Sequence, residues 1–189
     1  MKIIIGHSNT DLDCIGSIVL AKYLYPDHLA VRSALLHPVA RRLGTLYQHQ
    51  INFIHPKDLK GENIESIIIV DTRTTGRVAE YFRYIDNNGY DMEIWDHHPE
   101  ENSGFPDAIL HETPCGANTS QICAELLRRE LKISREDATI ALTGIYADTG
   151  NFTHENVTVL DFEVASFLLD AGASLPLIKK FLRPLSGNH

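Results

Sequence analysis

The stretch KIIIGHSNTDLD, residues 2–13, carries the features that define this chain. A run of β-prone apolar residues ends at Gly6, and His7, Asp11 and Asp13 follow it. Strands this apolar are typical of buried parallel strands that helices cover on both faces. Ligands bind such a sheet at the carboxyl-terminal edge of its strands. The stretch therefore predicts a parallel α/β sheet with ligand-binding side chains after its first strand.

Two further apolar runs end in the same way. The run IIIV precedes Asp71, and the run MEIW precedes Asp96, His97 and His98. Because parallel strands end at one edge of a sheet, we expect the three clusters to converge there. Carboxylates crowded together repel, and burial adds to this cost unless a cation lies among them. Histidine and aspartate bind Mn²⁺, Mg²⁺, Co²⁺, Fe²⁺ or Zn²⁺, so we predict a divalent-metal site.

The composition is that of an ordinary globular domain. The chain has 189 residues, 43% hydrophobic and 22% charged, which allows one domain with a substantial core. Its net charge of -8 argues against a broad electrostatic grip on nucleic acid but leaves room for a local basic cleft. The three cysteines form no C-x-x-C pair, which predicts buried or half-buried free thiols. With no apolar run near the ~20 residues of a membrane span, we expect a cytoplasmic protein without membrane contact.

The hydrophobic pattern predicts strands alternating with helices, followed by a helical C-terminal part. Strands are expected at 2–6, 29–36, 52–54, 66–71 and 91–96, with an extra strand near 108–111. Helices are expected at 13–24, 38–50, 76–87, 118–131, 134–147, 158–171 and 174–182. The segments 57–65 and 99–116 are expected to be largely loop. This order indicates a parallel β-sheet flanked by helices.

Single motifs also have ordinary explanations. Asp11 or Asp13 could cap the helix that begins near Cys14. Asp71 could be a plain strand-end residue, and Asp148 a plain helix-end residue before a turn. Three strand ends that all carry acids make coincidence a poor explanation for the set as a whole.

The run Asp96-His97-His98 needs a division of roles. Adjacent residues that leave a strand point in opposite directions, so three in a row rarely bind one ion. We expect one histidine to bind metal. The other would face substrate or make a hydrogen bond to a side chain that binds the metal. Asp96 could orient a histidine by accepting its N–H. An exposed His-His turn is the simpler alternative.

The motifs together resemble a known family. In order and spacing, the set His7-x-x-x-Asp11-x-Asp13, Asp71, Asp96-His97-His98 and Asp148 resembles the four motifs of the DHH phosphoesterase superfamily. This superfamily includes RecJ-type exonucleases, oligoribonucleases, exopolyphosphatases and manganese pyrophosphatases. The stretches 37–41, 70–73 and 116–120 look most similar to the subgroup in which a DHH domain is joined to CBS modules and a poly(A)-polymerase-like region.

The resemblance implies an architecture and an activity. Residues 1–185 would form a Rossmann-like DHH catalytic domain and residues 186–189 a linker or tail, with the family's second substrate-binding domain absent from this chain. The activity implied is metal-dependent phosphoester hydrolysis in short oligonucleotides, nucleotides or polyphosphate, by attack of a metal-bound hydroxide. Two divalent ions are implied, with Mn²⁺ the usual choice and Mg²⁺ or Co²⁺ as alternatives.

The resemblance also implies roles for the motif residues. His7, Asp11 and Asp71 would hold one metal ion. The other ion would be held by Asp13, Asp71, His97 and Asp148, with Asp71 bridging the two. His98, with Asp96 beside it, would contact the scissile phosphate or help to protonate the leaving group.

Other candidate substrate contacts have simpler alternatives. Arg73 and Arg77 could meet a phosphate or could be solvated. Asn118, Thr119 and Ser120 open a helix whose backbone N–H groups could bind an anion, although plain N-capping is favoured.

Phe105, Tyr146 and Phe152 could stack on a base, although core packing is the favoured use. His37 is expected to be structural or exposed. The expected partners are a phosphate-containing small molecule or a short single-stranded nucleic acid, together with further domains of a longer polypeptide; a homo-oligomer is left open. The alternative function is a non-catalytic metal- or nucleotide-binding regulatory module of a larger RNA-processing, poly(A)-polymerase-like protein.

Overall fold

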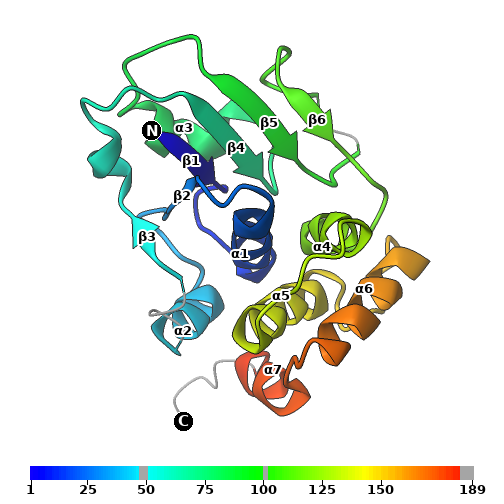
Figure 1. Cartoon of the computed structure of the whole chain (residues 1–189). Coiled ribbons are helices and arrows are strands. Elements are labelled where there is room, and N and C mark those ends of the chain that lie inside the picture. The colour runs from blue at the N-terminus through cyan, green and yellow to red at the C-terminus, as the bar shows by residue number, and fades with distance from the viewer. Residues whose placement is uncertain (47–50, 100–101, 184–189) are drawn as a thin grey trace.

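Six parallel strands form one sheet in the order β3-β2-β1-β4-β5-β6 (Figure 1). The computed structural model describes residues 1–46, 51–99 and 102–183. The strands are β1 (Lys2–Ile5), β2 (Leu29–Val31), β3 (Phe53–Ile54), β4 (Ser66–Val70), β5 (Asp91–Trp95) and β6 (Ile109–His111). The predicted parallel α/β sheet, with its extra strand near 108–111, is confirmed.

The strand order brings the motif-bearing strands together. The chain builds β1, β2 and β3 toward one edge of the sheet, then returns beside β1 to build β4, β5 and β6 toward the other. The strand order therefore reverses between β1 and β4, which is where open α/β sheets bind ligands. The three loops that follow β1, β4 and β5 start at neighbouring positions on the same edge.

Alternating strand residues face two different layers. On one face, Ile4, Ile68 and Val70 share a core with α1 (Leu12–Leu24), α4 (Asn118–Arg128) and α5 (Arg135–Asp148). On the other face, Ile3 and Ile69 pack with the 3₁₀ turns η1 (Pro56–Leu59) and η2 (Thr75–Val78) and the short helix α3 (Ala79–Phe82). Figure 1 shows α1, α4 and α5 together on one side of the sheet, with α3 on the other. Both faces of β1 and β4 are thus buried, as their unbroken apolar sequence predicts.

The remaining helices lie farther from the sheet. They are α2 (Pro38–Leu46), α6 (Val159–Asp170) and α7 (Leu175–Phe181). Helix α6 packs on α4 and α5, and α7 packs on α5 and α2. The predicted helical C-terminal part is therefore present as an outer layer.

Three predicted elements differ from the structure. The strand predicted at 29–36 ends at Val31, and beyond it only Leu36 forms an isolated bridge, to Thr10. The predicted loop 57–65 begins with the turn η1, whose Leu59 is fully buried. The helix predicted at 76–87 is a 3₁₀ turn followed by one α-helical turn. The helix ends at Phe82, and farther along the chain the side chain of Asn87 exchanges two hydrogen bonds with the backbone of Ile64.

The end of the predicted helix 38–50, at 47–50, and the predicted tail 186–189 lie outside the described residues. The assignment of residues 1–185 to one catalytic domain stays a prediction. No helix in the described ranges combines the length and apolar character of a membrane span.

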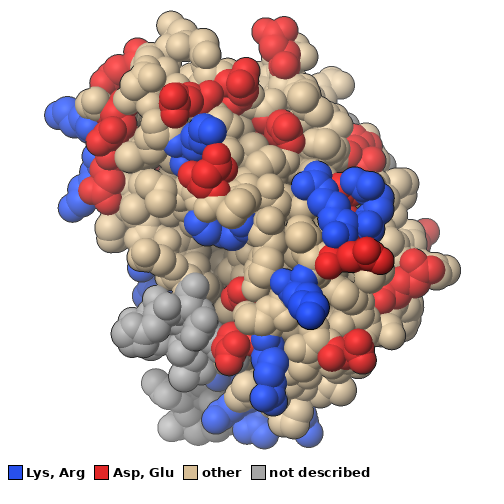
Figure 2. Space-filling model, viewed as in Figure 1, with Lys and Arg blue, Asp and Glu red and all other residues tan. Residues whose placement is uncertain are grey.

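Acidic and basic side chains lie close together on the face shown in Figure 2. Among the described residues on this face, no broad region of one sign stands out, despite the net charge of -8.

Candidate metal centre

The loop after β1 brings its polar side chains to the sheet edge through close packing and a helix cap. A Cβ at Gly6 would lie 2.1 Å from the sulfur of Cys14, so only glycine fits there. Asp11 caps α1 by accepting the backbone N–H of Cys14 at 2.9 Å. The same Oδ1 atom lies 3.6 Å from Nε2 of His7. The capping explanation is therefore correct for Asp11, and the cap also places its carboxylate beside a histidine.

Asp71 lies at the centre of the cluster, on a strained backbone. Its φ of 64° is in the left-handed region, which a residue other than glycine rarely adopts and which is often found at functional sites. Its N–H still donates to the carbonyl of Trp95, at 2.8 Å. One carboxylate oxygen, Oδ2, lies 3.2 Å from Nε2 of His7. The other, Oδ1, lies 3.5 Å from Nε2 of His97.

Nε2 of His97 gathers two further acids. It lies 3.8 Å from Oδ2 of Asp13 and 3.4 Å from Oδ2 of Asp148. Asp148 arrives from the last turn of α5, which crosses α1 closely at Gly144. A Cβ there would lie 2.7 Å from the carbonyl oxygen of Leu12. The structure thus brings together all six residues predicted as metal ligands: His7, Asp11, Asp13, Asp71, His97 and Asp148.

The ring orientations of both histidines suit metal binding. Nδ1 of His7 lies 2.9 Å from the carbonyl of Ser8, and Nδ1 of His97 lies 3.1 Å from that of Cys115. If each Nδ1–H donates to its carbonyl, each Nε2 turns a lone pair toward carboxylate oxygens. Nε2 of His97 and Oδ1 of Asp71 are two of the five buried side-chain atoms in the described ranges that have no hydrogen-bond partner. Two unpartnered electron-pair donors 3.5 Å apart fit a cation between them.

The electrostatics of the cluster also call for positive charge. Burial, followed by the charges of Asp71 and Asp148, raises the pKa of Asp13 well above its usual value. Burial and the charge of Asp71 raise the pKa of Asp148 to about 6. Burial opposes protonation of His97, but its contacts with Asp71, Cys115 and Asp13 raise its pKa to about 12. Either protons or metal ions must therefore compensate the carboxylates.

The pKa values of Asp71 and His7 shift in the directions expected for an ion pair. Burial opposes ionisation of Asp71, but His7 and His97 lower its pKa below the usual range. Burial also opposes protonation of His7, whose pKa is nevertheless raised by Cys14, Asp11 and Asp71. The four aspartates at 11, 13, 71 and 148 would carry four negative charges when ionised, the amount that two divalent cations balance.

Helix α4 holds Asp13 from behind. The backbone N–H groups of Asn118 and Thr119 donate to its two oxygens, each at 2.9 Å, and the Thr119 hydroxyl donates at 2.7 Å. The hydroxyl of Ser120 donates to Asp161 at 2.6 Å. All three predicted anion-binding residues are fully buried, and these donors are used inside the protein. The anion at this helix start is thus the carboxylate of Asp13, and direct substrate contact by residues 118–120 stays a prediction.

His98 belongs to a second polar chain. Its Nδ1–H donates to Asp96 at 2.5 Å, and Asp96 accepts Nε–H of Arg73 at 2.7 Å. Arg73 also donates to Glu112, at 2.7 Å. The hydrogen bond to Asp96 raises the pKa of His98. Asp96 thus orients His98, and Arg73, predicted as a phosphate contact, lies buried behind it, whereas Arg77 is exposed.

Several residues near the site were not assigned a role from the sequence. Asp161 accepts bonds from the backbone of Gly116 and Ala117 and so fixes the loop before α4. Its T-x-x-D capping box with Thr158 is a readable signal. Glu112 gives no such signal, because its partner is distant in sequence. Cys14 offers its sulfur within 4.8 Å of ligand atoms of His7 and Asp71. All three cysteines are buried free thiols, as predicted.

A hollow of about 250 Å³ opens at the cluster. Its walls include Asp11, Asp13, Asp148 and the exposed His37. His98 and Asp148, with side chains 38% and 34% exposed, can be reached from solvent, whereas those of Asp71 and His97 are 4% exposed. Substrate could therefore approach the cluster from this side.

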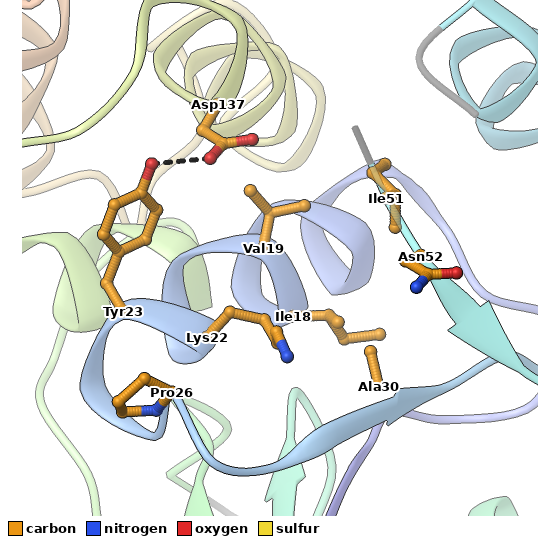
Figure 3. A pocket seen from close by; sticks show the side chains of 9 residues that line it. All are labelled: Ile18, Val19, Lys22, Tyr23, Pro26, Ala30, Ile51, Asn52 and Asp137. Atoms are coloured by element: carbon orange, nitrogen blue, oxygen red, sulfur yellow. Dashed lines mark hydrogen bonds between the residues drawn. The ribbon is translucent and has the colours of Figure 1, made fainter. Parts of the chain in front are cut away.

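A separate pocket of about 360 Å³ lies along the later turns of α1 (Figure 3). Three of its polar side chains already make hydrogen bonds within the protein: Tyr23 donates to Asp137 at 2.6 Å, and Lys22 donates to the carbonyl of His28 at 2.6 Å. Ile18, Val19 and Ala30 supply an apolar lining. None of the predicted ligands lines this pocket, so the acid and histidine chemistry belongs to the other hollow.

The sequence of this chain matches one family and is similar to several known proteins. The family described as "DHH family, N-terminal domain" matches residues 2–145. An A-adding tRNA nucleotidyltransferase of Geobacter sulfurreducens is 31% identical over 96% of this chain and 21% of its own length. The cyclic-di-AMP phosphodiesterase GdpP of Bacillus subtilis is 29% identical over 96% of this chain and 29% of its own length. A probable bifunctional oligoribonuclease and PAP phosphatase NrnA of Streptococcus mutans is 29% identical over 88% of this chain and 51% of its own length.

Two solved structures share the fold. A putative family II inorganic pyrophosphatase of Methanococcus jannaschii matches with a TM-score of 0.71 and 23% identity, over 96% of this chain and 60% of its own. An exopolyphosphatase-related protein of Bacteroides fragilis matches with a TM-score of 0.72 and 21% identity, over 95% and 55%. The chain spans only about a fifth to a half of the curated relatives described above.

Proposed function

The chain belongs to the DHH family, and from this premise we propose that it hydrolyses a phosphodiester or phosphoanhydride bond with the help of two divalent cations. The observation that carries the proposal is the position of Asp71. Its two carboxylate oxygens face two different histidines, one toward His7 and one toward His97. A carboxylate placed in this way can serve two ions at once.

The donors separate into two sets around Asp71. His7 and Asp11 lie on its Oδ2 side, while Asp13, His97 and Asp148 lie on its Oδ1 side. We propose that each set, together with Asp71, holds one ion, with Mn²⁺ the first candidate. Carboxylate oxygens with few imidazoles suit Mn²⁺, Mg²⁺ and Co²⁺. When bound, two such cations supply Lewis-acid activation of the phosphoryl oxygens and lower the pKa of the attacking water.

His98 is the proposed proton donor to the leaving oxygen. Its Nδ1 is held by Asp96, which leaves Nε2 as the free end of a partly exposed ring. The hydrogen bond to Asp96 raises the pKa of His98, which favours the protonated ring that a proton donor needs. Asp96 and Arg73 act as positioning residues in this scheme, because they hold the ring and do not themselves face solvent.

Metal binding provides a test that does not require turnover. Calorimetry on chelator-treated protein should give two Mn²⁺ per chain, and the apparent heat should depend on the buffer because metal binding displaces protons from the ligands. Asp71→Asn should disrupt both sites, and Asp13→Asn should remove one. Asp170→Asn, at an exposed position of α6, is the matched control and should retain two.

Hydrolysis is measured on the same samples. A dinucleotide, tripolyphosphate and methyl p-nitrophenyl phosphate form a panel that separates diester from anhydride cleavage. We expect activity with Mn²⁺ and none in chelator. Full turnover in chelator, or two ions retained by Asp71→Asn, would contradict the mechanism.

The similarity to an A-adding tRNA nucleotidyltransferase favours a second candidate. That protein is far longer than this chain, so the same fold could serve there as a metal- or nucleotide-binding module. Stoichiometric Mn²⁺ and dinucleotide binding without cleavage of any panel member would support this second function over hydrolysis.

A further inference from the structure

A second hollow adjoins the proposed metal centre. It has a volume of about 510 Å³ and lies between the end of α5 and helix α7. Its walls include Tyr146, Asn151, Ile178, Lys179, Leu182 and Arg183. Leu182 also lines the hollow at Asp11, Asp13 and Asp148. The two hollows thus share Leu182 as a lining residue, and each is lined by one residue of the last turn of α5, Tyr146 in one and Asp148 in the other.

The lining combines an aromatic ring, apolar side chains and an exposed amide. Tyr146 is half-buried, and an edge-to-face contact with Phe152 at 4.9 Å fixes its ring. Ile178 and Leu182 supply apolar surface. Asn151 has a φ of 57°, so a tight turn presents its exposed amide at the rim. Such a lining suits a flat heteroaromatic ring that also needs hydrogen bonds.

Two cations complete the lining. Lys179 and Arg183 are both exposed, and within residues 1–46, 51–99 and 102–183 neither forms an ion pair or a side-chain hydrogen bond. These two positive charges contrast with the net charge of the whole chain, which is -8. Cations beside a cluster of acids would attract a phosphate that the acids alone would repel.

Resting on the hydrolytic function proposed above, we propose that this hollow binds one nucleoside unit of a short single-stranded nucleic acid. The base lies against Tyr146, and Lys179 and Arg183 contact the phosphate next to the one that is cleaved. An inorganic polyphosphate chain has the charge for the two cations but no ring for the apolar wall. The hollow therefore favours an oligonucleotide over polyphosphate as the substrate class.

The test compares two substrates in the same variants. The dinucleotide pApA carries the base that the proposal places in the hollow, whereas methyl p-nitrophenyl phosphate is a small diester that reports on the metal centre alone. For Tyr146→Leu, kcat/KM for pApA should fall about 5- to 100-fold more than for the small diester, the range expected for a lost base stack. Tyr146→Phe retains the ring and should restore most of the ratio.

The cations are tested in the same way. Lys179→Gln with Arg183→Gln should weaken pApA binding and reduce its dependence on salt. Lys180→Gln changes the next residue of α7, which does not line the hollow, and should leave both substrates unchanged. Equal losses on both substrates in Tyr146→Leu, or a Lys180→Gln effect as large as that of the pair, would overturn the proposal.

Binding separates this inference from the proposed activity. Labelled pApA is titrated in Ca²⁺ against wild type, Tyr146→Leu and Tyr146→Phe, with circular dichroism confirming that each is folded. If no substrate is cleaved but Tyr146→Leu alone weakens binding, hydrolysis fails and the base site stands. If wild type and Tyr146→Leu bind pApA equally, the base site fails whatever the activity.

Discussion

Thr119 donates both its backbone N–H and its hydroxyl to the same carboxylate oxygen of Asp13, at 2.9 and 2.7 Å, across 106 positions of sequence. The first turn of α4 therefore fixes the side chain of Asp13, a proposed metal ligand in the first turn of α1. With Asn118 on its other oxygen, Asp13 has little freedom to rotate. A buried carboxylate fixed in this way is ready to bind an ion without reorganisation.

The first prediction removes the hydroxyl of Thr119. Thr119→Val keeps the shape of the side chain but loses the 2.7 Å hydrogen bond, so we expect metal affinity to fall about 10- to 100-fold. Thr143→Val is the control, because Thr143 is equally buried but donates only to the carbonyl of Thr139 on its own helix. Mn²⁺ titration calorimetry on both variants measures the difference. Similar affinity losses in the two variants would mean that the hydroxyl does not act through Asp13.

The second prediction separates two arginines that look alike in the sequence. Arg73→Gln removes the guanidinium from the buried Asp96 and leaves it only His98 as a charged partner, which should cost roughly 1–3 kcal/mol of unfolding free energy. Arg77 is exposed, so Arg77→Gln should change stability by less than about 0.5 kcal/mol. Urea unfolding of both variants provides the comparison. An unfolding free energy unchanged by Arg73→Gln would show that Asp96 does not depend on it.

The residues at the strand ends can be predicted from the sequence, whereas the different surroundings of the two arginines cannot. Strand ends in a parallel sheet converge by geometry, so the meeting of His7, Asp71 and His97 follows from three short apolar runs alone. The predicted sheet and most helices follow from local periodicity in the same way. Arg73 and Arg77 differ only in what surrounds them, and the partner Glu112 lies 39 positions away. No local pattern identifies such a pair.

The same limit applies to helix starts. The sequence Asn118-Thr119-Ser120 correctly predicts a helix N-terminus, but the favoured N-capping role is wrong, because the N-cap is Ala117, which makes no side-chain capping hydrogen bond. The anion at its backbone N–H groups comes from a helix far earlier in the chain. Here long-range hydrogen bonds decide between two locally acceptable outcomes.

The third prediction concerns the packing that places Asp148. At Gly144 a new Cβ would lie 2.7 Å from the carbonyl oxygen of Leu12 and 3.2 Å from Cα of Asp13. Because backbone atoms must then shift, Gly144→Ala should cost about 1–3 kcal/mol and weaken Mn²⁺ binding. At Gly76 no atom lies within 4 Å of a new Cβ, so Gly76→Ala should do neither. Thermal unfolding with and without Mn²⁺ gives both quantities, and a normal metal-induced stabilisation in Gly144→Ala would contradict the prediction.

The fourth prediction is a pH dependence of the metal-free protein. Asp148 has a pKa of about 6 in the fold, against 3.8 for a free aspartate, so between these values the folded state binds more protons than the unfolded state. Stability in chelator should therefore fall as pH rises from about 4 to 6. Asp13 shifts in the same direction and adds to this fall. The lowered pKa of Asp71 changes stability only at pH values below this window, and the raised pKa of His97 changes it only at pH values above the window.

Asp148→Asn tests the assignment, because an amide has no charge to desolvate in that window. We expect the fall between pH 4 and 6 to become shallower in the variant, with Asp13 accounting for what remains. Urea unfolding at pH 4, 5 and 6 in chelator gives the slopes, and Asp170→Asn serves as the exposed control. Saturating Mn²⁺ should reverse the trend in wild type, since the ion binds only deprotonated carboxylates and binds more tightly as pH rises. Parallel slopes in wild type and Asp148→Asn would show that this carboxylate is not the group that titrates.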